Sequence, residues 1–281
     1  MEHMQGKICL VTGSTSGIGR VTARELAKMG ATVVLASRDK SKGEATRDEI
    51  KAQNRNASVD MLLADLSSQQ SVRQLAQDFT DRYSRLDVLV NNAGGIFLRR
   101  STTIDGLERT FAVNHLAPFL LTNLLLDTLK ASAAARVVTV ASGAHQGATI
   151  NFDDLQAEKR YNAMRAYGQS KLATILFTYE LAKRLQGTNV TANCLHPGTV
   201  ATNFGSDNGP VLSFLIKLAL RTGISPEKGA ETSSYLASSP EVEGVTGKYF
   251  SDCKEISSSK ESYDESVSQR LWEVSVELTK L

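Results

Sequence analysis

The chain has 281 residues, of which 41% are hydrophobic, and this is enough to bury the core of one large α/β domain. Its formal net charge is +2 and its lysines and arginines form no long basic block, so the composition gives no sign of a nucleic-acid partner. We therefore expect a single domain over residues 1–281 that binds no nucleic acid.

The three cysteines, Cys9, Cys194 and Cys253, are too few and too widely spaced for a disulfide framework or a CxxC metal site. We expect no metal, and a reduced protein of the cytoplasm. A membrane span is not expected either. The first apolar strand begins about six residues after Met1, and the later apolar stretch at 211–220 is only ten residues long and contains Lys217.

Apolar strand-like runs alternate with amphipathic helical stretches along the chain. Seven strands are expected, near residues 7–11, 31–37, 58–64, 86–90, 135–141, 188–195 and 247–250. Several of these runs are apolar at most successive positions, as strands covered on both faces should be. Helices are expected to begin at caps such as Ser67 followed by Gln70, and Ser225 followed by Pro226. This pattern predicts an α/β fold, a Rossmann-type doubly wound sheet of about seven mainly parallel strands with helices on both faces.

The first strand leads into a glycine-rich turn, TGSTSGIG, at residues 12–19, and a helix is expected over 20–29. Such a turn between strand and helix suits the pyrophosphate of a dinucleotide, because the helix N-terminus offers unpaired N–H groups to an anion. Gly13 would permit the tight turn, Gly17 the close approach of the backbone to the pyrophosphate, and Gly19 the close packing of the helix. The spacing is G-x-x-x-G-x-G and differs from the common G-x-G-x-x-G fingerprint.

The choice of cofactor is expected to depend on the end of the second strand. An acidic residue there would bind the ribose hydroxyls of NAD and repel a 2′-phosphate, whereas this chain has Ser37 and Arg38. Arg38 can form a charge-assisted fork to the phosphate and stack on the adenine, and Ser37 can donate to the same oxygens. NADP(H) is therefore the expected cofactor. The alternative is that Arg38 is an ordinary surface arginine beside Asp39 and Lys40.

Tyr167 and Lys171 stand four residues apart, about one helical turn, so both side chains project from one face of a helix. An ammonium in that place can stabilise a phenolate, and acid/base catalysis near neutral pH needs the pKa of Tyr167 well below its ordinary value. Ser142 follows the strand at 135–141, where ligand-facing residues of such a sheet belong, and its hydroxyl can hold a carbonyl oxygen. The Tyr-x-x-x-Lys spacing alone is common by chance. Together with the glycine turn it predicts an oxidoreductase.

The order of these motifs resembles that of the short-chain dehydrogenase/reductase family over essentially the whole chain. The landmarks are Thr12-Gly13-x-x-x-Gly17-Ile18-Gly19, Asp65-Leu66, Asn91-Asn92-Ala93-Gly94, Asn114, Ser142, Tyr167-x-x-x-Lys171 and Pro197-Gly198. The stretches NHLAPFLLTNLLL, LHPGTV and GKYFSDCK are similar to the retinol dehydrogenase-like branch. Relatives in that branch often carry an N-terminal membrane anchor, which is not expected here.

The resemblance implies a role for each landmark. Tyr167 would protonate the carbonyl oxygen during reduction, and Ser142 would hold that oxygen in line. Lys171 would stabilise the tyrosinate and reach the nicotinamide ribose, while Asn114 would bind a water that connects Lys171 to solvent. The implied cofactor-binding residues are Gly13, Ser14, Thr15, Ser16, Gly17, Ile18, Gly19, Ser37, Arg38, Asp65, Leu66, Asn92, Ala93, Gly94, Tyr167, Lys171, Pro197, Gly198, Val200 and Thr202.

The substrate side is expected to be apolar. Residues 208–222 combine a Gly209-Pro210 hinge with six apolar side chains, as a lid over a hydrophobic ligand would, although a helix packed on the core is an equal alternative. Ser142 and Tyr167 are 25 residues apart, about twice the separation in many short members of the family, and the added segment 147–165 is expected to wall one side of the cleft. His145 and His196 are further candidates near the site.

The sequence thus predicts an NADP(H)-dependent alcohol dehydrogenase or carbonyl reductase acting on a hydrophobic carbonyl or alcohol. Two alternatives stay open, a carbon–carbon double-bond reductase on the same fold and a non-catalytic NADP(H)-binding scaffold protein. A homo-oligomer is also open, because the apolar stripe expected on the C-terminal helix, with Trp272 beside it, suits either packing or a subunit contact.

Overall fold

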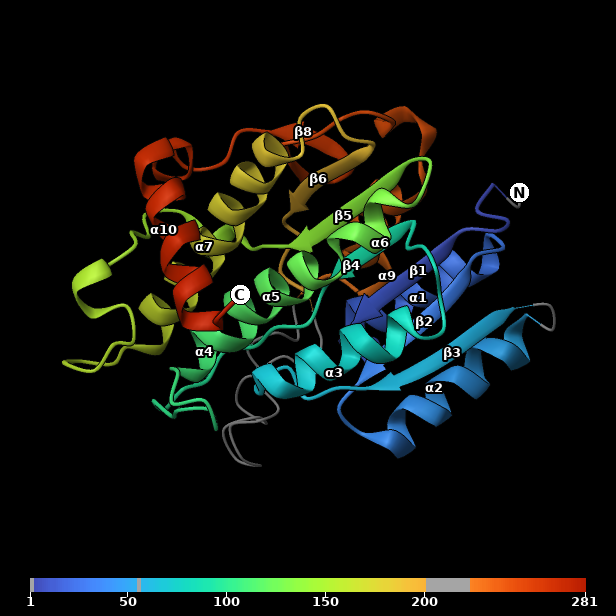
Figure 1. The fold of residues 1–281 in the computed structure, drawn as a ribbon, viewed down its shortest axis with the longest axis horizontal. Coiled ribbons are helices and arrows are strands. Elements are labelled where there is room, and N and C mark those ends of the chain that lie inside the picture. The colour runs from blue at the N-terminus through green and yellow to red at the C-terminus, as the bar shows by residue number, and fades with distance from the viewer. Residues whose placement is uncertain (1–2, 55–56, 201–222) are drawn as a thin grey trace.

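The computed structural model describes residues 3–54, 57–200 and 223–281, and its strands form one sheet with the order β3-β2-β1-β4-β5-β6-β7-β8 (Figure 1). The strands are β1 (Ile8–Thr12), β2 (Thr32–Ser37), β3 (Ser58–Leu63), β4 (Val88–Asn91), β5 (Ala135–Val140), β6 (Val190–Leu195), β7 (Tyr249–Ser251) and β8 (Lys254–Ile256). Every neighbouring pair is parallel except β7 and β8. The predicted doubly wound sheet is confirmed, and its order reverses between β1 and β4.

The eighth strand is the one that the sequence reading missed. β8 is three residues long and exposed at each of them, so it has no apolar pattern that a sequence reading could detect. It pairs with β7 through a tight turn in which Asp252 and Cys253 both have positive φ, 49° and 59°. The prediction of about seven strands is therefore one short of the eight observed.

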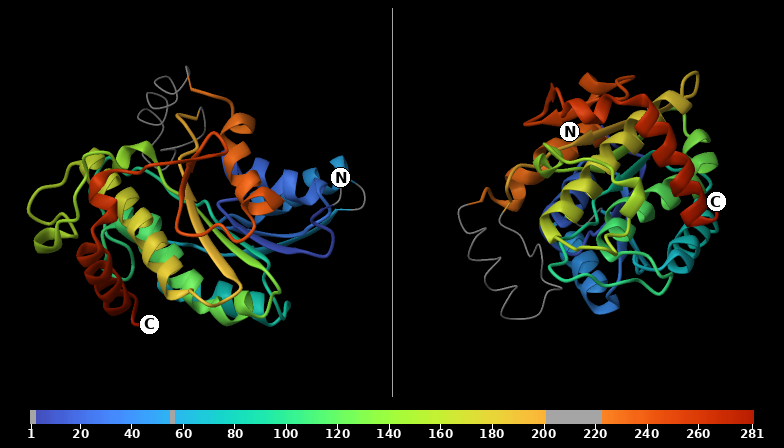
Figure 2. Two further views of the ribbon diagram at one scale, coloured as in Figure 1. Left: turned by 90° about the horizontal axis from the view of Figure 1, so that it is seen from above. Right: turned by 90° about the vertical axis from the view of Figure 1, so that its left-hand side faces the viewer.

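Helices cover both faces of the sheet, as the apolar strands require. They are α1 (Gly17–Lys28), α2 (Lys40–Gln53), α3 (Gln69–Thr80), α4 (Arg109–Phe111), α5 (Ala117–Leu124), α6 (Leu126–Lys130), α7 (Ala163–Arg184), α9 (Pro226–Ser238) and α10 (Glu265–Thr279). α1 and α9 pack together on one face, while α3 packs with α5 on the other and α10 packs against α7 (Figure 2). None of the helices within the described ranges is long and apolar enough to cross a membrane.

One of the two predicted caps is confirmed and the other is wrong by one residue. The Ser225 side chain accepts a hydrogen bond from the Lys228 amide, with Pro226 in the first helical turn, as expected. α3 is capped by Ser68, because the hydroxyl and amide of Ser67 both donate to the Asp65 carboxylate, at 2.7 and 2.9 Å. The turn that follows β3 therefore delays the start of the helix by one position.

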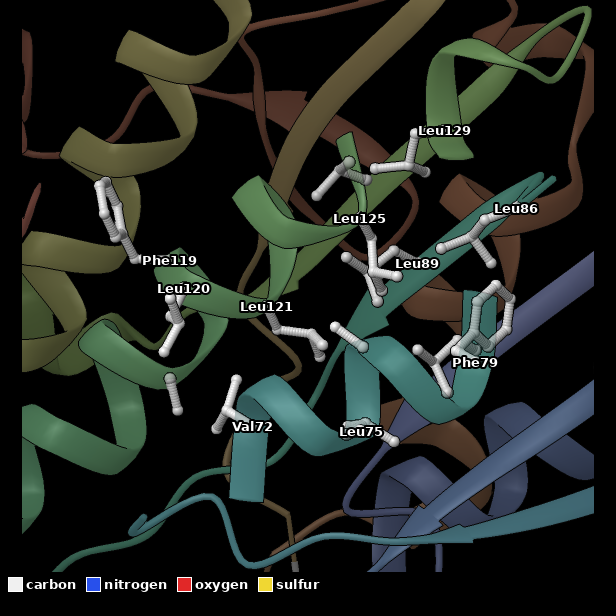
Figure 3. Packing of buried hydrophobic residues seen from close by; sticks show 14 of the residues in the cluster. Val72, Leu75, Phe79, Leu86, Leu89, Phe119, Leu120, Leu121, Leu125 and Leu129 are labelled. Atoms are coloured by element: carbon white, nitrogen blue, oxygen red, sulfur yellow. The ribbon is translucent and has the colours of Figure 1, made fainter. Parts of the chain in front are cut away.

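The core on the α3 and α5 face is made of interlocking aliphatic and aromatic side chains. Figure 3 shows Val72, Leu75 and Phe79 of α3 near leucines of α5 and near Leu89 of β4. Trp272 of α10 lies against this core, with its ring 4.9 Å from that of Phe119 and 5.9 Å from that of Phe177. The interpretation of Trp272 as a packing residue is confirmed, and the apolar stripe of α10 is likewise covered by α7.

Candidate functional site

A cavity of about 660 Å³ lies where the carboxyl ends of the strands meet the segments that follow them. In a doubly wound sheet this is the edge at which ligands bind, next to the point where the strand order reverses. The lining residues are Gly13, Thr15, Ser16, Gly17, Ile18, Gly19, Ala36, Ser37, Arg38, Ala64, Asp65, Leu66, Ser67, Asn92, Ala93, Gly94, Gly95, Ile96, Phe97, Arg109, Val113, Val140, Ala141, Ser142, Gly143, Ala144, Met164, Tyr167, Lys171, His196, Pro197, Gly198, Thr199 and Val200.

The glycine turn has the geometry expected of it. Gly13 and Gly17 have φ values of +63° and +51°, which favour glycine, and a Cβ at Gly13 would stand 2.9 Å from the Ala93 Cα. A Cβ at Gly19 would overlap the Gly13 carbonyl oxygen and the Asn92 amide. The Asn92 amide donates to the Thr12 carbonyl at 2.8 Å and ties the turn to the segment after β4. Glycine at positions 13 and 19 therefore lets the turn pack closely against Asn92 and Ala93.

The side chain of Ser14, in the same turn, points away from the cavity. Its side chain is fully buried and donates to the Ala36 carbonyl at 3.2 Å, so it joins the turn to β2. The structure therefore gives Ser14 a structural contact and not a place in the cavity lining, although the sequence reading put it with the cofactor-binding residues.

Ser37 and Arg38 line the cavity at the end of β2, where cofactor choice was predicted. Ser37 Oγ donates to the Asp39 carbonyl at 2.8 Å, so its hydroxyl already serves the turn into α2. The Asp39 carboxylate caps α2 by accepting from the Lys42 amide at 3.1 Å. Asp39, the acidic residue nearest to Arg38 in the sequence, is thus the N-cap of α2.

Helix α7 brings Tyr167 and Lys171 to the residue that follows β5. A Cβ at Gly168 would stand 2.8 Å from the Ala144 carbonyl oxygen, so the missing side chain lets α7 approach the turn after Ser142 closely. The Tyr167 hydroxyl is hydrogen-bonded to the Ser142 side chain. Lys171 Nζ donates to the Val140 carbonyl at 2.8 Å and lies 5.8 Å from the centre of the Tyr167 ring. Three of the four predicted catalytic side chains, Ser142, Tyr167 and Lys171, therefore line the cavity together.

Burial shifts the ionisation of both residues on α7. Burial raises the pKa of Tyr167 to about 12, partly offset by the hydrogen bond with Ser142. Burial lowers the pKa of Lys171 to about 8. The expectation that Lys171 lowers the pKa of Tyr167 is wrong for this arrangement, because the ammonium is directed at the Val140 carbonyl and the loss of hydration dominates at the phenol.

Asn114 lies behind the cavity wall and does not line it. It belongs to a π-helical turn (Ala112–Leu116) between α4 and α5, a distortion that is frequent at functional sites. Its amide donates to the Gly95 carbonyl and to Ser170 Oγ, both at 2.9 Å, and its Oδ1 accepts from the Gly95 amide at 2.8 Å. A Cβ at Gly94 would stand 3.1 Å from Asn114 Oδ1 and 3.4 Å from Lys171 Nζ, so the three residues meet at one point.

The two histidines differ in their access to the cavity. His196 lines it, whereas His145 is fully buried and does not. Both rings are hydrogen-bonded to the backbone at Ser142 and Gly143. The two predicted candidates therefore flank the same turn from different sides.

The model of the short-chain dehydrogenase family matches residues 7–210. The chain belongs to this family. Human retinol dehydrogenase 14 is 46% identical over 291 aligned residues, which cover 97% of this chain and 86% of the human protein. Mouse retinol dehydrogenase 12 is 47% identical over 276 residues, which cover 98% of this chain and 87% of the mouse protein. The predicted membership of the retinol dehydrogenase-like branch is confirmed.

Solved structures of short-chain dehydrogenases share the fold. An uncharacterized protein from Mycobacterium paratuberculosis is 36% identical and superimposes with a TM-score of 0.80, covering 99% of this chain and 94% of that one. The active-site complex of Pseudomonas aeruginosa RhlG with NADP is 29% identical, with a TM-score of 0.69 and coverage of 89% and 96%.

Sequence reasoning missed the apolar end of the cavity of this short-chain dehydrogenase. Ile96 and Phe97 follow the Asn-Asn-Ala-Gly turn, Val113 precedes Asn114, and Met164 is 62% exposed at the mouth. Their positions next to the family landmarks were the available signal. From segment 147–165, which was predicted to wall the cleft, Met164 alone lines the cavity.

Two predicted parts of the site lie outside the described residues. These are Thr202 and the lid predicted at 208–222. The other predicted segment after β6 is described, and Pro197, Gly198 and Val200 line the cavity there.

Proposed function

We propose that this short-chain dehydrogenase is an NADP(H)-dependent oxidoreductase that interconverts a carbonyl and an alcohol on hydrophobic substrates. The observation that carries the proposal is the hydrogen bond between Tyr167 and Ser142 on one wall of the cavity whose other end is the glycine turn. A proton donor and a turn suited to bind a dinucleotide thus line the same cavity. That combination suits hydride transfer coupled to transfer of a proton.

The residues present fit a bound dinucleotide. Six residues of the turn at residues 12–19 line the cavity, and a side chain at Gly13 or Gly19 would clash with Asn92 and so disturb the turn. Asp65 and Leu66 line the side expected to hold the adenine. Arg38 at the end of β2 favours the 2′-phosphate of NADP over the free hydroxyl of NAD, because guanidinium forks pair well with phosphate. RhlG, a solved relative, was captured with NADP.

The nicotinamide would supply or accept the hydride when the cofactor is bound. For reduction, Tyr167 would donate its hydroxyl proton to the carbonyl oxygen of the substrate. Ser142 would hold the same oxygen, since its hydroxyl is already bonded to that of Tyr167. Lys171, with its pKa near 8, is mostly protonated at pH 7 and would balance the charge left on the tyrosinate.

A hydrophobic substrate is supported by four apolar side chains in the lining of the cavity. Ile96, Phe97, Val113 and Met164 present apolar surface there. Burying one such side chain against a substrate stabilises the complex by about 1.5–3 kcal/mol, which favours a large apolar alcohol or aldehyde over a small one. The names of the similar proteins, retinol dehydrogenases 12 and 14, agree with a substrate of this kind.

The proposal is tested by following oxidation of NADPH and of NADH with a panel of aldehydes, ketones and enones. We expect NADPH to be oxidised with large apolar aldehydes or ketones and the product to be the alcohol. An enone reduced only at its carbon–carbon double bond would favour the alternative reductase chemistry. Tight NADPH binding with no turnover on any member of the panel would favour a non-catalytic role.

A further inference from the structure

The peptide unit that joins Ser142 to Gly143 is hydrogen-bonded to an imidazole at each end. His145 Nδ1 lies 2.6 Å from the Ser142 carbonyl oxygen. On the other side, the Gly143 amide donates to His196 Nδ1 at 3.0 Å. Because the C=O and N–H of a trans peptide point in opposite directions, the two rings hold this peptide from opposite edges.

These hydrogen bonds fix the tautomer of each ring. The Ser259 amide donates to His145 Nε2 at 3.0 Å, so this nitrogen carries no proton and the ring donates to Ser142 through Nδ1. His196 accepts at Nδ1, so its single ring proton is on Nε2. A protonated imidazole donates from both nitrogens and accepts at neither. Protonation would therefore break the bond of His145 with Ser259 and the bond of His196 with Gly143.

The clamped peptide directly follows the side chain that holds Tyr167. Ser142 Oγ accepts from the Ala144 amide at 3.2 Å and is bonded to the Tyr167 hydroxyl. A Cβ at Gly143 would stand 3.3 Å from His196 Nε2, so the imidazole lies directly against the turn. A rotation of this peptide would carry Ser142 with it. The orientation of the Ser142 hydroxyl thus depends on both imidazole rings.

The two rings are themselves anchored by the C-terminal part of the sheet. His145 is bonded to Ser259 and packs on the ring of Tyr249 in β7, 5.1 Å away. The His196 amide donates to the Phe250 carbonyl at 2.8 Å. The turn at Ser142 is therefore coupled to β7 and to the segment after β8, which lie about a hundred residues further along the chain.

We propose that His145 and His196 are positioning residues: as neutral imidazoles they hold the Ser142–Gly143 peptide and thereby keep the Ser142 hydroxyl on Tyr167. This inference rests on the proposed function, in which Ser142 and Tyr167 handle the carbonyl oxygen. It assigns no chemical step to either histidine. Its consequence is a site that keeps its geometry only while both rings are uncharged.

The surroundings favour the neutral rings near pH 7. Burial lowers the pKa of both histidines. The carboxylates that face the rings raise these pKa values, Glu261 that of His145 and Asp252 that of His196. A positive charge on His145 would in turn lower the pKa of His196. Tyr167 and Lys171 of α7 line the same cavity as His196. Turnover should therefore fall as the pH drops below the ordinary histidine range, because His196 then loses its acceptor nitrogen.

The first test reads the tautomers directly and needs no turnover. Nitrogen-15 NMR of the full chain with labelled histidine should show His145 with its proton on Nδ1 and His196 with its proton on Nε2, both neutral at pH 7. The reverse tautomer at either ring, or a charged ring at pH 7, would overturn the clamp. The expected tautomers in a protein that reduces no carbonyl would support the clamp and contradict the proposed function instead.

The second test separates positioning from simple packing. His196→Asn keeps an acceptor near Nδ1 but cannot be protonated, whereas His196→Leu removes the acceptor. We expect kcat of His196→Asn within about threefold of wild type at pH 8 with a weaker fall toward pH 5.5, and kcat of His196→Leu about tenfold lower, the scale of one lost buried hydrogen bond. The Kd for NADPH should change less than about twofold in both.

The exposed His3 provides a matched control, since His3→Asn removes a histidine without touching the turn. It should leave both kcat and the pH profile unchanged. A wild-type kcat in His196→Leu would rule out a positioning role. So would a decrease of kcat toward pH 5.5 in His196→Asn that is as steep as in wild type. If His196→Leu fails to fold, the pH profile of His196→Asn still decides the question.

Discussion

Asp87 lies at the amino-terminal edge of the sheet and Tyr167 faces its carboxyl-terminal edge, and both side chains are almost fully buried. Asp87 is 2% exposed, and its oxygens accept from the Ile8 amide at 2.8 Å and Ser132 Oγ at 2.6 Å, with Lys7 at 3.3 Å. Burial alone would raise the pKa of Asp87, but these donors and the lysine outweigh it, so the pKa lies below its usual value.

At Tyr167 and Lys171 the hydrogen bonds with Ser142 and Val140 do not outweigh burial. Burial moves the pKa of each toward the neutral form, up at the phenol and down at the ammonium. Burial therefore has a different net effect on the pKa values at the two edges of the sheet. At the amino-terminal edge the donors outweigh burial and stabilise the charged carboxylate. At the carboxyl-terminal edge burial dominates and favours the neutral forms of the phenol and of the amine.

The largest expected effect tests the carboxyl-terminal edge. Tyr167→Phe removes the proton donor and keeps the ring, so kcat for carbonyl reduction should fall at least about a hundredfold, while the Kd for NADPH changes little. Steady-state kinetics and cofactor titration measure both. Tyr179→Phe is the matched control, because Tyr179 is on the same helix but bonds to Ser258 away from the cavity. Near-normal turnover in Tyr167→Phe would show that another group supplies the proton.

The next effect concerns the cofactor end of the same cavity. NADPH should bind more tightly than NADH by about 2 kcal/mol, roughly thirtyfold in Kd, and Arg38→Asp should reverse the preference. Isothermal titration with both cofactors gives the two constants. Arg47→Asp makes the same change of charge on α2 at a half-buried residue that does not line the cavity, and should leave the ratio unaltered. Equal constants for the two cofactors in the unmodified protein would contradict the assignment of Arg38.

The amino-terminal edge should respond in stability and not in catalysis. Asp87→Asn weakens the interactions of the carboxylate with its four partners, Lys7, Ile8, Arg85 and Ser132. The free energy of unfolding should therefore drop by about 2 kcal/mol, with kcat unchanged within about twofold. Urea denaturation and steady-state kinetics measure the two quantities. Asp78→Asn, a change on α3 at a residue with one exposed hydrogen bond, should lower the free energy of unfolding much less. A large loss of kcat in folded Asp87→Asn protein would mean that the two edges are coupled.

The smallest effect is the pH dependence of that stability. Because the pKa of Asp87 in the folded chain is below its ordinary value of 3.8, its contribution is complete above pH 3.8 and is lost as the pH falls through the lowered pKa. The difference in unfolding free energy between wild type and Asp87→Asn should therefore stay constant above pH 3.8 and shrink as the pH falls from 3.8 through the lowered pKa. A difference that stays constant over this interval would show that the Asp87 charge does not stabilise the fold.

The sequence was most informative where a short motif fixes its own geometry. The glycines of the first turn and the four-residue spacing of Tyr167 and Lys171 depend on local backbone structure, and each lies where it was predicted. The positions of seven strands follow from their apolar runs in the same way. The cap at Ser68 was displaced by a single side chain, the Asp65 carboxylate, which no helix rule takes into account.

What could not be predicted depends on groups distant in the chain. Ser259 and Phe250 anchor the two histidines, and neither has a spacing that relates it to Ser142. The direction of the pKa shift at Tyr167 depends on where the Lys171 ammonium points, and that is set by the Val140 carbonyl. The π-helical turn around Asn114 (Ala112–Leu116) was not expected from the sequence.

The packing of α10 on α7 has a consequence for how the protein is made. Residues 265–279 are synthesised well after residues 163–184, which carry the proton donor. At roughly 5–20 residues per second, the ribosome leaves one side of α7 without its partner for several seconds. During that interval the apolar stripe of α7 is open to chaperones or to misassembly with other chains. The helix that carries Tyr167 thus reaches its final packing only late in translation.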